Sequence, residues 1–167
     1  MSQNQQKEPE LQKTATTQKS ASLIRAVRNI AISVLGLLLL QYILGTATNL
    51  FANFPTQTAS INPLDNVFTN GPTLVLVHFV NGLALGLLSI SAVVVSVIVK
   101  SKRLILITVC GFGTILFAGE SGIEFVLGWY VNNLFSFLMS LGFILSFTAY
   151  FVLLWFANPR QLSIPSK

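Results

Sequence analysis

Four long apolar stretches, separated by short polar segments, organise the chain. Each stretch exceeds the roughly 20 apolar residues that an α-helix needs to cross about 30 Å of hydrocarbon. No polar helices remain to cover four such helices in a soluble core, and the stretches lack the short, alternating pattern of membrane-barrel strands. The pattern therefore predicts an all-α membrane protein, a four-helix transmembrane bundle with helices at 23–50, 73–99, 104–127 and 131–157.

The segments between the apolar stretches are typical of turns and loops. Asn53–Pro72 contains three prolines among Asn and Asp residues, which predicts a surface loop on one side of the membrane. Lys100–Arg103 predicts a tight basic turn on the other side. Gly128–Tyr130 predicts a second tight turn, with two aromatic residues suited to the membrane interface.

The two ends of the chain differ in composition from the apolar part. Residues 1–19 are rich in Gln, Thr, Lys, Ser and Glu without an apolar period, which predicts a disordered tail. The transmembrane domain is expected over residues 20–158, and residues 159–167 form a short second tail. No small-residue cleavage site follows the first apolar stretch, so this helix is expected to remain as an anchor.

Composition narrows the class of protein further. Only 9% of the 167 residues are charged, against about 25% in an ordinary soluble domain. The single cysteine, Cys110, rules out an internal disulfide framework and a cysteine-based zinc site, and is expected to be a small packing residue. The chain also lacks a phosphate-binding glycine loop, an HExxH motif and a CxxC motif. An enzyme is therefore not the expected class.

The positive charges lie on one side of the expected membrane. The net charge is +5, and all ten basic residues lie in the tails, near the start of the first apolar stretch or in the 100–103 turn. This distribution follows the positive-inside rule, so we expect a multi-pass protein of the cell membrane with both termini cytoplasmic. The charges then orient the chain and attract anionic lipids, and nucleic acid is not an expected partner. The ten basic residues are Lys7, Lys13, Lys19, Arg25, Arg28, Lys100, Lys102, Arg103, Arg160 and Lys167.

With this threading, the strongly polar side chains inside the helices gather in the outer half of the membrane. Helical spacing places Glu120 and Glu124 on one face, together with Gly113 and Phe117. Intramembrane ionisable groups are energetically expensive and therefore functional candidates. We expect an inward-facing polar pocket formed by His78, Asn81, Glu120, Glu124, Asn132 and Ser136.

Several roles remain open for this pocket. His78, Glu120 and Glu124 are expected to form a structural hydrogen-bonded trio, a proton or cation site, or a metal site, although the Glu-x-x-His element of di-metal bundles is missing. A further alternative is an electron carrier that binds b-type haem through His78 and Met139, which lie at similar depth on different helices.

Four scattered segments stand out along the chain: Asn49–Phe51 with nearby Pro55, Gly71–Pro72 followed by His78, Gly119–Phe125, and Ser136–Phe143. In these segments the chain resembles a group of uncharacterised small four-span prokaryotic integral membrane proteins. The resemblance implies the four-span architecture and transfers no functional residue.

The function expected from the sequence is that of a subunit or accessory protein of a membrane complex, respiratory complexes among them. The exposed segments are too small for an independent soluble catalytic site. The expected partners of the chain are the lipid bilayer and other membrane subunits or a second copy of the chain. The alternatives are the haem carrier and a protein that handles protons or cations.

Overall fold

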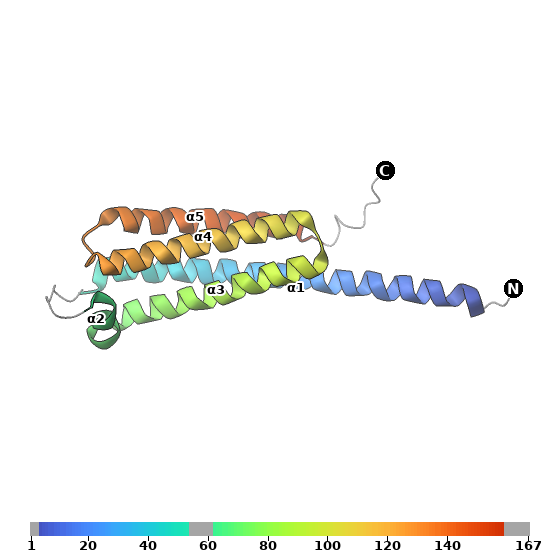
Figure 1. Ribbon diagram of the computed structural model, residues 1–167, viewed down its shortest axis with the longest axis horizontal. Coiled ribbons are helices and arrows are strands. Elements are labelled where there is room, and N and C mark those ends of the chain that lie inside the picture. Colours follow the sequence, from blue (N-terminus) through green and yellow to red (C-terminus); the bar gives the residue numbers. More distant parts are fainter. Residues whose placement is uncertain (1–3, 54–61, 159–167) are drawn as a thin grey trace.

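The computed structural model describes residues 4–53 and 62–158, with side chains described for Gln18 and from Ser20 onward. These residues contain five helices and no strand (Figure 1). The helices are α1 (Asn4–Phe51), α2 (Pro63–Asn70), α3 (Thr73–Val99), α4 (Lys102–Leu127) and α5 (Asn133–Phe156). Four of them, α1 from Ser20 onward, α3, α4 and α5, are long and apolar enough to cross a membrane.

The four long helices form an antiparallel bundle (Figure 1). α1 packs on α3, α3 on α4, α4 on α5 and α5 on α1, so α1 lies diagonally opposite α4, and α3 opposite α5. α2 lies at one end of the bundle, which we call the α2 end. α1 enters and α5 leaves at the other end, the tail end (Figure 1). The even number of crossings thus brings both termini to the same end.

The outer surface of the bundle is apolar along its length. Leu83, Leu87 and Trp155 are 59%, 60% and 69% exposed, and many other large apolar side chains are exposed as well. A continuous apolar surface of this size is far larger than the patches on soluble monomers. The architecture is therefore compatible with a small integral membrane protein whose outer surface faces lipid.

The core is built from small and branched side chains, interspersed with hydroxyl groups. Ser89, Thr108 and Ser146 are fully buried, and each hydroxyl donates to a carbonyl three or four residues earlier in its own helix, at 2.7–2.8 Å. These residues need no partner from another helix, so they permit close packing in a membrane interior. The apolar core comprises Val27, Ala31, Val34, Leu38, Leu85, Ala92, Leu104, Ile115, Tyr150, Leu153 and Ala157.

The most extensive contact between helices is that of α4 and α5. A Cβ atom on Gly142 would lie 2.7 Å from Ala118 Cβ, and one on Gly111 would lie 2.7 Å from Tyr150 Cε2. Both distances are shorter than real Cβ contacts, so a side chain at either position would force its neighbour to shift. This interface fixes the rotation of α4 about its axis.

Two elements differ from the sequence prediction. α1 begins at Asn4, where a disordered tail was expected over 1–19; residues 1–3 lie outside the described part. The segment is rich in good helix formers such as Gln, Lys, Glu and Ala, and extending an existing helix requires no new nucleus. The helix α2 also lies within the expected loop. Asn62 caps it by accepting a hydrogen bond from the Leu64 amide at 2.9 Å, and Pro63 occupies its first position.

Candidate functional site

A polar cluster near the α2 end joins α1 to α3. The Gln41 amide accepts a hydrogen bond from Asn81 Nδ2 through Oε1 at 2.6 Å, and its Nε2 lies 3.1 Å from His78 Nε2. Asn81 Nδ2 also donates to the Leu37 carbonyl at 3.1 Å. Asn81 is buried and His78 is half-buried. We call Gln41, His78 and Asn81 the α1–α3 clamp.

The hydrogen bonds of the clamp determine the protonation state of its histidine. The Leu37 carbonyl only accepts, so the Asn81 group beside it is the NH₂ group. That NH₂ group also faces Gln41, which must therefore present its oxygen to Asn81 and its own NH₂ group to His78. His78 Nε2 is then an acceptor. The imidazole is neutral and carries its proton on Nδ1.

The other side of the imidazole lies against the backbone of α1. A Cβ on Gly45 would lie 3.1 Å from His78 Cε1. The absence of a side chain at Gly45 therefore leaves room for the imidazole ring between the helices. His78 Nδ1 is buried and has no hydrogen-bond partner among the residues that the structure describes, and the same holds for Thr48 Oγ1 on α1. Such orphaned polar atoms in a core are typical positions for an ordered water.

Two other expected pocket residues lie at the α2 end but take different partners. Asn132 is exposed and caps α5, accepting a hydrogen bond from the Leu134 amide at 3.1 Å. Ser136 is contacted by Asn49 Nδ2 of α1 at 3.5 Å, the upper limit for a hydrogen bond. The structure thus joins His78 with Asn81 but does not join either to Asn132 or Ser136 through the contacts described.

The two glutamates lie outside the bundle interior, contrary to the inward-facing arrangement expected from the sequence. Both Glu120 and Glu124 are exposed on α4. In the described residues, no group of three or more His, Cys, Asp or Glu side chains is close enough to hold a metal ion. The physical reason is the rotation of α4. Glu120 lies about 180° around the helix from Gly111, at 100° per residue, and Gly111 is in contact with α5.

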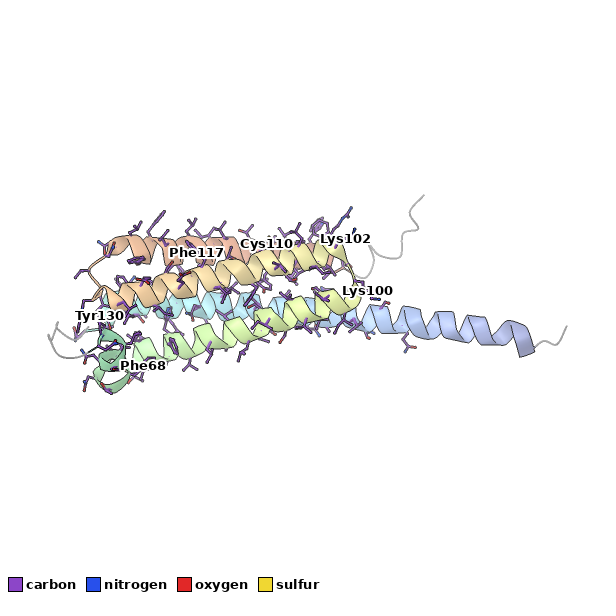
Figure 2. The ribbon with its side chains drawn as sticks, viewed as in Figure 1. Phe68, Lys100, Lys102, Cys110, Phe117 and Tyr130 are labelled. Carbon is purple, nitrogen blue, oxygen red and sulfur yellow. The ribbon has the colours of Figure 1, made fainter. Side chains whose placement is uncertain are left out.

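The glutamates belong to a continuous exposed face of α4. Its members follow one another at alternating steps of four and three residues, within an arc of about 80°. Leu106 is 65% exposed and Phe117 is 37% exposed. Cys110 and Phe117, both labelled in Figure 2, mark the course of this face along α4. We call it the α4 seam; it comprises Leu106, Cys110, Gly113, Phe117, Glu120 and Glu124, all exposed.

Glu120 lies deeper than Glu124 in a membrane centred on α4. The helix has 26 residues and is therefore about 39 Å long, against about 30 Å of hydrocarbon. With both ends overhanging equally, the Glu120 backbone lies about 7 Å inside the hydrocarbon and that of Glu124 close to its boundary. A carboxyl group facing lipid has no hydrogen-bond partner and is costly at this depth.

The expected haem ligands, His78 and Met139, have different neighbours in the structure. Met139 lies against α4, where its Sδ would be 3.3 Å from a Cβ on Gly122. His78 is held against α1 by Gln41 and Gly45, and its helix lies diagonally opposite α5. The two side chains thus contact different helices, His78 the helix α1 and Met139 the helix α4.

Sequence reasoning did not assign Gln41, Gly45 or Gly142 to these contacts. Gln41 and Gly45 are four residues apart, so a polar and a small residue share one face of the first helix. That pairing was the available signal for the clamp. Comparisons of the chain with models of protein families, with curated proteins and with solved structures found no match.

Proposed function

We propose that this chain is a small multi-pass membrane protein that serves as a subunit or accessory protein of a larger membrane complex. The observation that carries the proposal is the exposure of Glu120 within a membrane-spanning helix. A carboxyl group at this depth is stabilised when another protein covers it and supplies hydrogen bonds or charge, whereas lipid supplies neither.

The packing of the chain supports this assignment. The rotation of α4 is fixed by Gly111 and Gly142 at the α5 interface, so Glu120 does not reach the interior without breaking that interface. The clamp around His78 has the partners expected of a structural contact between α1 and α3. It holds the bundle together, while the α4 seam faces the partner.

The proposed orientation places the α2 end outside the cell and both termini in the cytoplasm, in the cell membrane. It is supported by the sequence, in which all ten Lys and Arg residues lie in the tails, near the start of the first span or in the 100–103 turn. Glu120 and Glu124 then lie in the outer half of the membrane.

The proposal is tested by the size of the particle that the chain forms. We expect extraction from native membranes in mild detergent, followed by native mass spectrometry, to find it in a particle of defined composition, larger than its own 18.2 kDa. The double variant Glu120→Gln/Glu124→Gln should release the chain from that particle. Ser91→Ala, an exposed polar position on α3, is the matched control and should leave the particle intact. A chain that is monomeric in the wild-type extract contradicts the proposal.

A further inference from the structure

The α4 seam is shaped for close contact with another helix. Its residues repeat at alternating steps of four and three, the spacing at which one helix follows another along a shallow left-handed crossing. Cys110 and Gly113 are small and occupy its middle, and a Cβ on Gly113 would meet no atom within 4 Å. A neighbouring backbone can therefore approach α4 closely at this point.

The charge of the seam determines what kind of helix it fits. Glu120 and Glu124 lie one turn apart near the α2 end, and both are exposed. The sequence contains no Lys or Arg between Arg28 and Lys100, or between Arg103 and Arg160. The chain itself thus offers no cation at the depth of these carboxyl groups. His78 lies at the α1 interface, where Gln41 occupies its Nε2.

A second copy of the chain is a poor match for the same reason. Parallel packing of two copies through this seam would bring Glu120 against its symmetry mate, so that like groups would meet in a medium of low dielectric constant. A cationic side chain from another protein would instead pair with the carboxylates, and a close ion pair in such a medium is strong.

We infer that the α4 seam binds a transmembrane helix of a different protein that carries a lysine or arginine at the depth of Glu120. Cys110 and Gly113 provide the close approach, and Glu120 and Glu124 select the cation. This inference rests on the proposed function, since it names the chemistry of the partner that covers the seam.

Synthetic transmembrane peptides test this recognition directly. The chain is labelled with a donor dye at Ser101→Cys in a Cys110→Ser background, because Ser101 makes no side-chain capping hydrogen bond. It is reconstituted in lipid vesicles with acceptor-labelled leucine–alanine helices. One peptide carries two lysines, one at the depth of Glu120 counted from each end. It therefore presents a lysine at this depth in either orientation. Matched peptides carry glutamate or leucine at the same positions.

We expect energy transfer to report about tenfold tighter binding of the lysine peptide than of the leucine peptide. The glutamate peptide should bind no better than the leucine peptide. Glu120→Gln/Glu124→Gln should remove the preference for lysine, Glu120→Lys should transfer it to the glutamate peptide, and Ser91→Ala should leave it unchanged. Equal binding of the lysine and leucine peptides by the wild-type chain would overturn the inference. Self-association that depends on the glutamates would also overturn it, with a second copy as the occupant.

The outcome is separable from that of the proposed function. The chain could bind the lysine peptide no better than the leucine peptide and still be found in a defined larger particle in native membranes. This result would contradict only the inference that the partner carries a cation. A chain that is monomeric in native membranes contradicts the proposed function.

Discussion

Ser146 of α5 and Thr114 of α4 bring their hydroxyl oxygens to 2.9 Å across the most extensive helix contact of the bundle. Because this contact lies between the glycine contacts of the same interface, the two helices are in register along this stretch. The α5 interface occupies one side of α4 and leaves the seam with Glu120 on the opposite side. The internal packing of the chain thereby determines which surface of α4 is exposed.

Adding one methyl group to the α4–α5 interface should destabilise the fold. Gly142→Ala places a Cβ 2.7 Å from that of Ala118 and 3.1 Å from the Thr114 carbonyl oxygen, so the helices must separate. We expect a loss of about 1–3 kcal/mol in the free energy of unfolding, as for other overpacked cores. Unfolding in mixed detergent micelles measures it. Gly86→Ala is the control, since a Cβ there meets nothing within 4 Å, and a loss of equal size in both variants would contradict this account of the interface.

The α1–α3 clamp should behave as a coupled unit. Gln41→Leu leaves Asn81 without its 2.6 Å acceptor, and Asn81→Leu leaves the Gln41 oxygen without its donor. In a double-mutant cycle we expect a coupling free energy of about 0.6 kcal/mol, the average for hydrogen bonds between membrane helices, and at most about 1.7 kcal/mol. The Gln41→Leu/Ser91→Ala pair should be additive, because no contact joins these residues in the structure. Additivity of Gln41 with Asn81 would mean that their hydrogen bond contributes no stability.

The hydrogen bonds of the clamp predict which ring nitrogen of His78 carries the proton. Because the Gln41 NH₂ group donates to His78 Nε2, the imidazole should carry its proton on Nδ1. Nitrogen-15 solid-state NMR of the protein in bilayers reports the two ring nitrogens separately, and His78 is the only histidine of the chain. We expect Nε2 without a proton in the wild type, and a mixture of tautomers in Gln41→Leu. A wild-type spectrum dominated by protonated Nε2 would show that the amide is oriented the other way.

Glu120→Leu should have opposite effects on the isolated chain and on the assembled complex. In the isolated chain it removes a carboxyl group from an exposed position on α4, so the free energy of inserting the chain into bilayers should become more favourable by about 1–3 kcal/mol. In the complex it removes the proposed contact with the partner, so dissociation in detergent should become faster. Ile123→Leu, another exposed position on α4, should change neither quantity. Less favourable insertion of the isolated chain would show that Glu120 is bonded within the bundle.

The sequence predicts the positions of the spans well, because their ends are marked by charge, proline and glycine. The expected second span at 73–99 coincides with α3 (Thr73–Val99), and the expected third span at 104–127 differs from α4 (Lys102–Leu127) only at its start. The helix α2 was missed although Asn62 and Pro63 form a typical helix start. The three prolines around it favoured a loop, and a short helix has no long apolar period to reveal it.

The orientation of each face was not predictable in the same way. Periodicity correctly groups Gly113, Phe117, Glu120 and Glu124 on one side of their helix, and the structure has all four exposed. Whether that side faces inward or outward is not encoded in hydrophobicity, because lipid tails are as apolar as the protein core. Which side of α4 faces inward depends on the steric fit between α4 and α5 at Gly111 and Gly142. This fit is a property of the helix pair, so the sequence of either helix alone does not predict it.

Photo-crosslinking within native membranes tests the central claim, that a protein covers the α4 seam. A photoreactive amino acid is placed at Phe117, on the seam, and at Leu87, on the exposed surface of α3. We expect position 117 to yield one discrete protein adduct and position 87 to yield lipid adducts. Lipid adducts alone at both positions would contradict the account, because they would show that Glu120 faces the bilayer in the native membrane.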